Sequence, residues 1–448
     1  MHRYIPVGVL RTYLGCEMSV PDLNEDNEST SQELETADSS TDLSNLKTRW
    51  NLLLQSFKTS QIPFLLVAVF LTLLVAKILV IISVEWMVVE EVIPNGWLYL
   101  NPYDASDIEG TPEILLALAN RWDSQHFLEI ARNGYPIGVE SDLLFAFAPV
   151  YPLMVAFLSQ LVNNLYLSGV VVSNSFYFLS IIAFYKVARL YMDYEKSCLL
   201  ALVFGIFPIY LAYSTLAYSE APYLFFTIAS WYFFKKEWYL PCSLFMTLSI
   251  LTRYISLLLV IIYGISILSN LLDKYKEMNS LRRAFDVKLL WFLIPGFCVT
   301  IVFLYFQSLT GSFFAAFDAH GYFGDSLTTP FHQFMWFFGG FFVEINPGAD
   351  PFALMILRYM FTIPFFILTL ILFRDDLELG FYGLVFMWFT LSMEGISGVA
   401  SPRIMLSAWV AFFALKGRMS SALYIVLAVM FFFVGIWVMY QFQLTFFA

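Results

Sequence analysis

The chain has 448 residues, of which 59% are hydrophobic, 19% are aromatic and only 13% are charged, and its mean hydropathy is +0.72. A soluble domain of this length does not need so much apolar surface, and the apolar runs are continuous rather than alternating, which excludes an outer-membrane β-barrel. The net charge is −11, and the lack of a basic patch argues against nucleic acid as a partner.

The first 58 residues are predicted to form a disordered acidic tail on the cytoplasmic side. The segment from Asp22 to Asp42 carries much of the negative charge and contains no aromatic residue, a composition that cannot bury a core. The four cysteines of the chain lie far apart and show neither a metal-binding spacing nor a disulfide framework.

Apolar stretches long enough to cross a bilayer recur from Ile62 almost to the C-terminus, so residues 59–448 are predicted to form the membrane domain. The sequence therefore predicts an all-α polytopic membrane protein, and the length rule gives about eleven crossings. Basic residues precede the first span, and most later basic clusters are separated by pairs of spans, so all of them can lie inside.

This topology places the N-terminus inside, the C-terminus outside, and two long loops outside, over residues 85–147 and 310–351. A full crossing by the apolar segment 147–161 would invert everything downstream of it. We therefore interpret that segment as a re-entrant or tilted helix bordering an outer site.

A dense polar cluster follows the first span and contains Arg121, Trp122, Asp123 and His126. A single helix over residues 115–132, lying along the membrane surface, would place Asp123 and His126 on one face. A carboxylate at a water–lipid boundary can act as a general base, because burial raises its pKa. The alternative is an interfacial helix whose Asp123 merely pairs with Arg121.

Three further ionisable residues interrupt apolar stretches. Glu220, two residues after Tyr218, lies at the predicted outer mouth of two spans, where it could bind a metal or a polar headgroup, or bond to neighbouring helix ends. Arg253 and Arg403 are solitary guanidiniums suited to phosphate. Snorkelling to the interface explains either arginine alone better than it explains both.

His320, Asp325 and Glu394 are weaker candidates. His320 and Asp325 share the second outer loop, where a His/Asp cluster could hold a metal, but their irregular spacing favours a loop hydrogen-bond network. Glu394 is similarly ambiguous. The sequence identifies no cofactor and leaves a divalent cation open. It has no Walker loop, dinucleotide glycine pattern or Gly-x-Ser-x-Gly elbow, which argues against a nucleotide-driven pump or a soluble-type hydrolase.

Taken in order, these motifs resemble the PIG-V family of mannosyltransferases, whose members include the enzyme that adds the second mannose to GPI anchors, and prokaryotic relatives. The resemblance is carried by Arg-Trp-Asp at 121–123, Asn-Gly-Tyr at 133–135, Phe-Ala-Pro-Val-Tyr-Pro at 147–152, Ala-Tyr-Ser-Glu-Ala at 217–221, Thr-Arg-Tyr at 252–254 and Ser-Pro-Arg at 401–403. The chain departs from the family where Ala-Pro replaces the usual Phe-Pro and where Thr-Arg-Tyr replaces Arg-Ser-Asn-Gly.

The resemblance implies an inverting, GT-C-type glycosyltransferase whose site faces the lumen or exterior. The implied donor is a polyprenyl-phosphate sugar, such as dolichyl-phosphate mannose, and the implied acceptor is a lipid-linked glycan. By this analogy Asp123 is the general base, and Arg253 and Arg403 hold the lipid phosphate. The supporting residues are Arg121, Trp122, His126, Tyr218 and Glu220, of which Glu220 could instead hold a metal.

The short outer loops and the C-terminus slightly favour a prokaryotic cell membrane over the endoplasmic reticulum membrane. The resemblance leaves a small membrane partner subunit open. Two other functions remain as alternatives: a transporter or flippase of a lipid-linked substrate, and a non-catalytic subunit of a glycosyltransferase complex.

Overall fold

The computed structural model describes residues 62–93, 98, 110–138, 142–280, 286–323, 327–329, 352–393 and 400–444. All of them belong to one compact unit, residues 61–448. The predicted acidic tail, large parts of both predicted outer loops, Asp325 and Glu394 lie outside the described residues.

The named elements of the described part of the chain are all helices. Five stretches are long and apolar enough to cross a membrane. They correspond to α2 (Ile62–Val89), α7 (Leu165–Tyr191), η3 (Tyr254–Leu257) with α12 (Leu258–Met278), η4 (Val287–Phe292) with α14 (Leu293–Thr310), and α21 (Ser421–Leu444). The prediction of an all-α polytopic membrane protein is confirmed.

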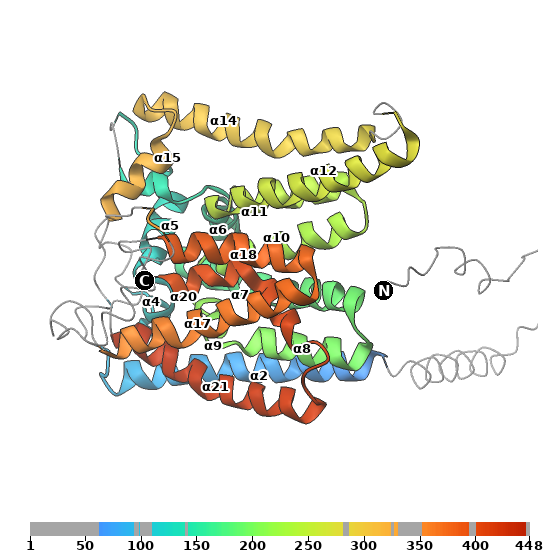
Figure 1. Cartoon of the computed structure of the whole chain (residues 1–448). Coiled ribbons are helices and arrows are strands. Elements are labelled where there is room, and N and C mark those ends of the chain that lie inside the picture. The colour runs from blue at the N-terminus through green and yellow to red at the C-terminus, as the bar shows by residue number, and fades with distance from the viewer. Residues whose placement is uncertain are drawn as a thin grey trace, which may run out of the picture. The chain divides into compact units, whose positions relative to one another are not determined.

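Further helices complete the bundle. Among them are α8 (Tyr194–Ile206), α9 (Pro208–Tyr213), α10 (Glu220–Lys235), α11 (Tyr239–Ile250), α17 (Phe352–Asp375), α18 (Leu377–Ser392), α20 (Ser401–Ile404) and η6 (Met405–Leu415). Helix α10 packs between α7 and α11, α17 packs on α18 and η6, and α2 and α21 pack on α8. The long helices run roughly side by side. The short helices α4 (Glu113–Ala119), α5 (Asp123–Asn133), α15 (Ala315–Asp318) and α20 lie toward one end of them (Figure 1).

Basic residues collect at the opposite end of the helices. Lys235, the last residue of α10, pairs with Glu378 at the start of α18 (2.6 Å). Arg418, just after η6, pairs with Asp375 at the end of α17 (2.5 Å). One end of the bundle is therefore rich in cations and the other carries the polar motifs, as the topology prediction requires; which end faces the cytoplasm stays a prediction.

The prediction of one helix over residues 115–132 is wrong. The structure has α4 (Glu113–Ala119) and α5 (Asp123–Asn133), separated by a break at residues 120–122. Trp122 has φ +49° and ψ −125°, a conformation outside the helical region. The side chain of Asn120 donates to the carbonyl of Leu98 (3.0 Å), away from α4 and α5. The break makes Asp123 the first residue of α5, where a helix favours negative charge.

Helix α6 (Val150–Val162) begins beside the site and is short. Its 13 residues extend about 20 Å, less than the roughly 30 Å of a bilayer core. The hydroxyl of Tyr151 bonds to the carbonyl of Gly169 (3.2 Å) and to Ser173 (3.0 Å), so α6 runs back along the start of α7. This arrangement fits the re-entrant interpretation of residues 147–161.

Candidate functional site

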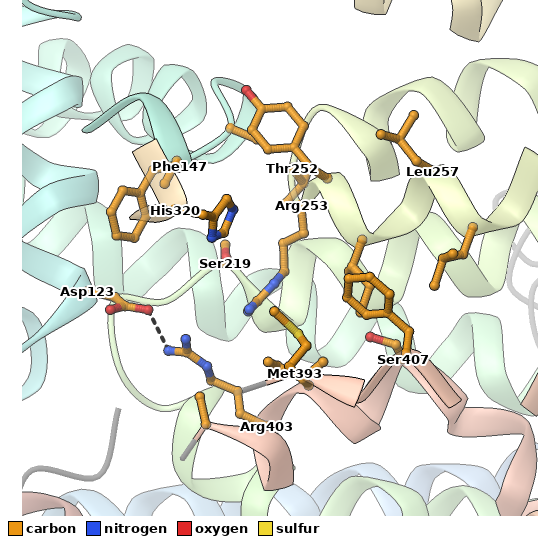
Figure 2. A pocket seen from close by; sticks show the side chains of 18 of the residues that line it. Asp123, Phe147, Ser219, Thr252, Arg253, Leu257, His320, Met393, Arg403 and Ser407 are labelled. Carbon is orange, nitrogen blue, oxygen red and sulfur yellow. Dashed lines mark ion pairs between the residues drawn. The ribbon is translucent and has the colours of Figure 1, made fainter. Parts of the chain in front are cut away.

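Four ionisable side chains from separate parts of the sequence meet at the polar end of the bundle. Asp123 begins α5, Glu220 begins α10, Arg253 precedes η3, and Arg403 lies in α20. Arg403 Nη1 lies 2.6 Å from Asp123 Oδ2, and its Nε lies 3.1 Å from Glu220 Oε1. Arg253 Nη1 also pairs with Glu220 Oε1. Figure 2 shows the Asp123–Arg403 pair, with the Arg253 side chain pointing toward Arg403.

The cluster is largely removed from solvent. The exposed side-chain fractions are 2% for Glu220, 8% for Arg403, 18% for Asp123 and 20% for Arg253. Burying a charge is costly unless it is paired. Here two carboxylates balance two guanidiniums, and a single oxygen of Glu220 holds the two cations near each other despite their mutual repulsion.

Aromatic rings support both guanidiniums. The guanidinium carbon of Arg403 lies 5.4 Å from the ring centroid of Tyr218 and 5.6 Å from that of Tyr213, and that of Arg253 lies 5.9 Å from Tyr223. Ring faces stabilise cations at these distances. The structure therefore brings the predicted Tyr218 to the cluster. Sequence reasoning missed Tyr213 and Tyr223, whose only signal was their closeness in sequence to Glu220.

A cavity of about 430 Å³ opens beside the cluster. Its charged and polar lining includes Asp123, Arg253, Arg403, Ser219 and His320. The rest of its lining is mainly apolar, with Phe127, Phe147, Ile255, Leu257, Leu258, Phe317, Phe389, Met393 and Ile404. The cavity is thus lined both by two guanidiniums and by aliphatic and aromatic side chains.

The sequence predicted that burial would raise the pKa of Asp123, but the surroundings of this residue lower that pKa. Burial acts to raise the pKa of this carboxyl, but the surrounding basic side chains lower it more, chiefly Arg403 through its charge and its hydrogen bond. The pKa therefore falls below its usual value of 3.8. Asp123 is ionised at neutral pH and ready to accept a proton.

His126 lies on the same helix as Asp123 and packs against the cavity wall. Its ring centroid is 4.9 Å from that of Phe147, which lines the cavity. Burial lowers the pKa of His126 below 6.5, although Asp123 and Asp142 oppose the shift. The imidazole is therefore mainly neutral at neutral pH and supports the wall rather than adding a cation.

Arg121 is directed to the last helix of the bundle. It donates to the side-chain oxygen (3.2 Å) and the main-chain oxygen (2.9 Å) of Gln443, and Gln443 donates to the carbonyl of Ala117 (3.0 Å). The alternative in which Asp123 only pairs with Arg121 is wrong, because Asp123 pairs with Arg403. Sequence reasoning missed Gln443, although an amide inside an apolar span was a usable signal.

Two of the remaining predicted residues can be placed in the structure, and two cannot. Trp122 forms the break before α5, and its ring lies 5.4 Å from the Arg121 guanidinium. His320, in η5 (Ala319–Phe323), reaches the cavity from the segment that follows α14. Asp325 and Glu394 cannot be placed, since they lie outside the described residues. Within the described ranges, no three His, Cys, Asp or Glu side chains gather as a metal site would need.

Comparison with known proteins adds one finding. Residues 98–322 match the family model described as Mannosyltransferase (PIG-V). The match spans Asp123, Glu220, Arg253 and His320, and Arg403 lies after it. A search of curated proteins found no match.

Proposed function

The chain belongs to the PIG-V family of mannosyltransferases and is an integral membrane protein, and on this premise we propose the reaction that its cavity performs. Mannose is transferred from a polyprenyl-phosphate donor, such as dolichyl-phosphate mannose, to a lipid-linked glycan acceptor. The observation that carries the proposal is the convergence of Asp123, Arg253 and Arg403 on one cavity with an apolar wall.

The donor's chemistry matches the two halves of the cavity. A polyprenyl-phosphate sugar carries one negative charge between a polar sugar and a long apolar chain. Guanidiniums bind phosphate oxygens through their planar array of donors, which suits Arg253 and Arg403. Apolar side chains such as Leu257, Leu258 and Phe389 offer a surface for the first isoprene units.

The reaction needs a base on one side of the sugar and cations on the other. Asp123 accepts the proton of the acceptor hydroxyl while that oxygen attacks the anomeric carbon. The bond from this carbon to the phosphate oxygen breaks, and its electron pair stays with the phosphate, whose charge changes from −1 to −2. Arg253 and Arg403 stabilise the added charge, and attack from the opposite side inverts the anomeric centre.

Arg403 links donor binding to the strength of the base. In the unliganded site its charge holds the pKa of Asp123 low. A bound phosphate competes for the same guanidinium, which removes part of that effect and lets burial raise the pKa. Asp123 therefore becomes a stronger base when the donor is in place.

The proposed face is the exterior or lumen. The site lies at the end of the bundle opposite Lys235 and Arg418, and the positive-inside rule assigns such cations to the cytoplasm. A prokaryotic cell membrane is slightly favoured over the endoplasmic reticulum. Placement of the charges at one end also favours an enzyme over a transporter, whose polar groups gather near mid-membrane.

The deciding experiment is sugar transfer in nanodiscs from radiolabelled polyprenyl-phosphate mannose, with a lipid extract as acceptor. The wild type is expected to label a lipid, and Asp123→Asn to lose about 10²- to 10⁴-fold in rate. Glu129→Gln is the matched control, because Glu129 lies on the same helix and bonds to Asn133 (2.9 Å). Full activity in Asp123→Asn would refute the role of this residue. An inactive wild type beside a working control mannosyltransferase would refute the donor.

A further inference from the structure

A lysine is buried inside the first spanning helix. Lys77 lies near the middle of α2 and is only 2% exposed. Among the described residues it has no carboxylate partner, and it contacts the neutral side chains of Ser214, Thr215 and Tyr177. A charged group at this depth is costly, so one that is kept indicates a functional use.

Two hydroxyl oxygens accept hydrogen bonds from the amino group of Lys77. Its Nζ lies 2.7 Å from Ser214 Oγ and 3.0 Å from Thr215 Oγ1, and 4.1 Å from the ring centroid of Tyr177. Both hydroxyls donate their own protons to main-chain carbonyls of α9. They can only accept from Lys77, so its amino group donates both hydrogen bonds beside the carbonyl end of that helix.

Lys77 thereby anchors the turn of residues 214–219, which we call the anchored turn. This turn is also bonded to α7 and α4: Asn174 donates to the carbonyl of Thr215 (3.2 Å), and Ala217 N donates to the carbonyl of Leu118 (2.9 Å). The next residue after the turn is Glu220, so the position of the turn sets the position of that carboxylate.

Three partners of Arg403 come from the anchored turn or from the residue on either side of it. Glu220 pairs with its Nε, and the rings of Tyr213 and Tyr218 flank its guanidinium. These three partners lie within residues 213–220. Because Glu220 also pairs with Arg253, a displaced turn would change the spacing of both cations.

We propose that Lys77 is a positioning residue that holds the anchored turn and, through Glu220, sets the two guanidiniums at the spacing that a phosphate requires. This inference rests on the proposed function of the cavity. It assigns Lys77, a buried ionisable residue of a membrane helix, to the geometry of donor binding rather than to contact with the donor.

The test compares binding of farnesyl phosphate and farnesol to the full-length protein in nanodiscs. Lys77→Met is expected to weaken farnesyl phosphate binding by about tenfold to a hundredfold, because small displacements of charged groups are costly, and to leave farnesol binding unchanged. The donor KM in the transfer assay should rise in parallel. Lys196→Met is the matched control. Lys196 likewise donates a side-chain hydrogen bond, to Met419 O (2.8 Å), and lies near a tyrosine ring, but it belongs to the start of α8.

Ser214→Ala separates positioning from the mere presence of the lysine. It keeps the Lys77 amino group and removes one of its two hydroxyl partners, so a smaller loss of the same kind is expected. It also carries the test if Lys77→Met does not fold. An unchanged preference for the phosphate in both variants, or a parallel loss for phosphate and alcohol, would overturn the inference. A wild type that binds both ligands equally would instead overturn the proposed phosphate site, and this inference with it.

Discussion

At the scale of single residues, Arg403 connects the two chemical tasks proposed for the cavity. It pairs with the carboxylate of Asp123, proposed as the base, and with Glu220, which also holds Arg253. The charge of Arg403 beside Asp123 explains why this buried carboxylate can remain ionised. The ionisation of Asp123 therefore depends on one neighbouring side chain.

This dependence predicts a shift in the pH profile of Arg403→Gln. In the wild type the pKa of Asp123 lies below 3.8, so the carboxylate stays ionised until the pH falls below that value. Without the Arg403 charge, burial raises this pKa, and the carboxylate becomes protonated at a higher pH. The acidic limb of kcat/KM is therefore expected to move to higher pH, beside a large loss of rate. Arg374→Gln, at an exposed ion pair, should keep the wild-type limb; an unmoved limb in Arg403→Gln would contradict the coupling.

Sequence reasoning selected Asp123, Glu220, Arg253 and Arg403 because charges in apolar surroundings are rare, and the structure brings these four together. Their roles in catalysis stay predictions. Lys77 escaped notice because a single lysine hardly lowers the hydropathy of α2. Its hydroxyl partners are more than 130 residues away in the sequence.

At the scale of elements, the break between α4 and α5 decides where Asp123 points. Propensity and spacing predicted one continuous helix, and the tertiary contacts of Asn120 and Arg121 replaced that helix with a break. A residue such as Trp122 at positive φ costs about 1–3 kcal/mol and persists only where its surroundings hold it. The last helix, α21, provides part of that hold through Gln443.

Gln443→Leu tests this support. The variant removes a partner from both Arg121 and the carbonyl of Ala117, each buried, at a cost of about 1–3 kcal/mol for each group left without that partner. We expect a lower thermal unfolding midpoint and a lower kcat, because Asp123 directly follows the break. Tyr440→Phe, at a more exposed position of the same helix, should match the wild type in both measurements. Wild-type stability in Gln443→Leu would show that α21 is dispensable for the break.

A second element-scale prediction concerns the close approach of α7 to the anchored turn. A Cβ placed on Gly169 would lie 2.8 Å from Cβ of Ala217, so Gly169→Ala must displace the turn or the helix. Such overpacking costs about 1–3 kcal/mol, and here it is expected to lower transfer activity as well. Gly264→Ala is the control, because nothing lies within 4 Å of its Cβ position and alanine favours a helix. Equal activity and stability in the two variants would contradict the tight contact.

At the scale of the whole molecule, the separation of charge between the two ends of the bundle is the main feature. The proposed site occupies one end, and ion pairs such as Lys235–Glu378 occupy the other. The arrangement agrees with the predicted topology but does not by itself orient the protein. Orientation is therefore a question for labelling.

The face of the site is tested by cysteine accessibility in a background with Cys16→Ser and Cys298→Ser, since Cys198 and Cys242 are buried. Asn133→Cys lies at the exposed end of α5, and Arg374→Cys lies at the basic end of α17. A membrane-impermeant maleimide added from the exterior or lumen is expected to label the first variant, and the second only after permeabilisation. The reverse pattern would place the site on the cytoplasmic face.

The sequence by itself determined the class of this protein: long apolar runs require helices in a bilayer, since backbone groups there must bond within one segment. It also determined which residues were chemically unusual, because each charge stands out against hydrocarbon. Only the tertiary structure decided how those residues combine. The helix break before Asp123, the shared oxygen of Glu220 and the anchoring by Lys77 all depend on contacts between segments distant in the chain, and local spacing carries no record of such contacts.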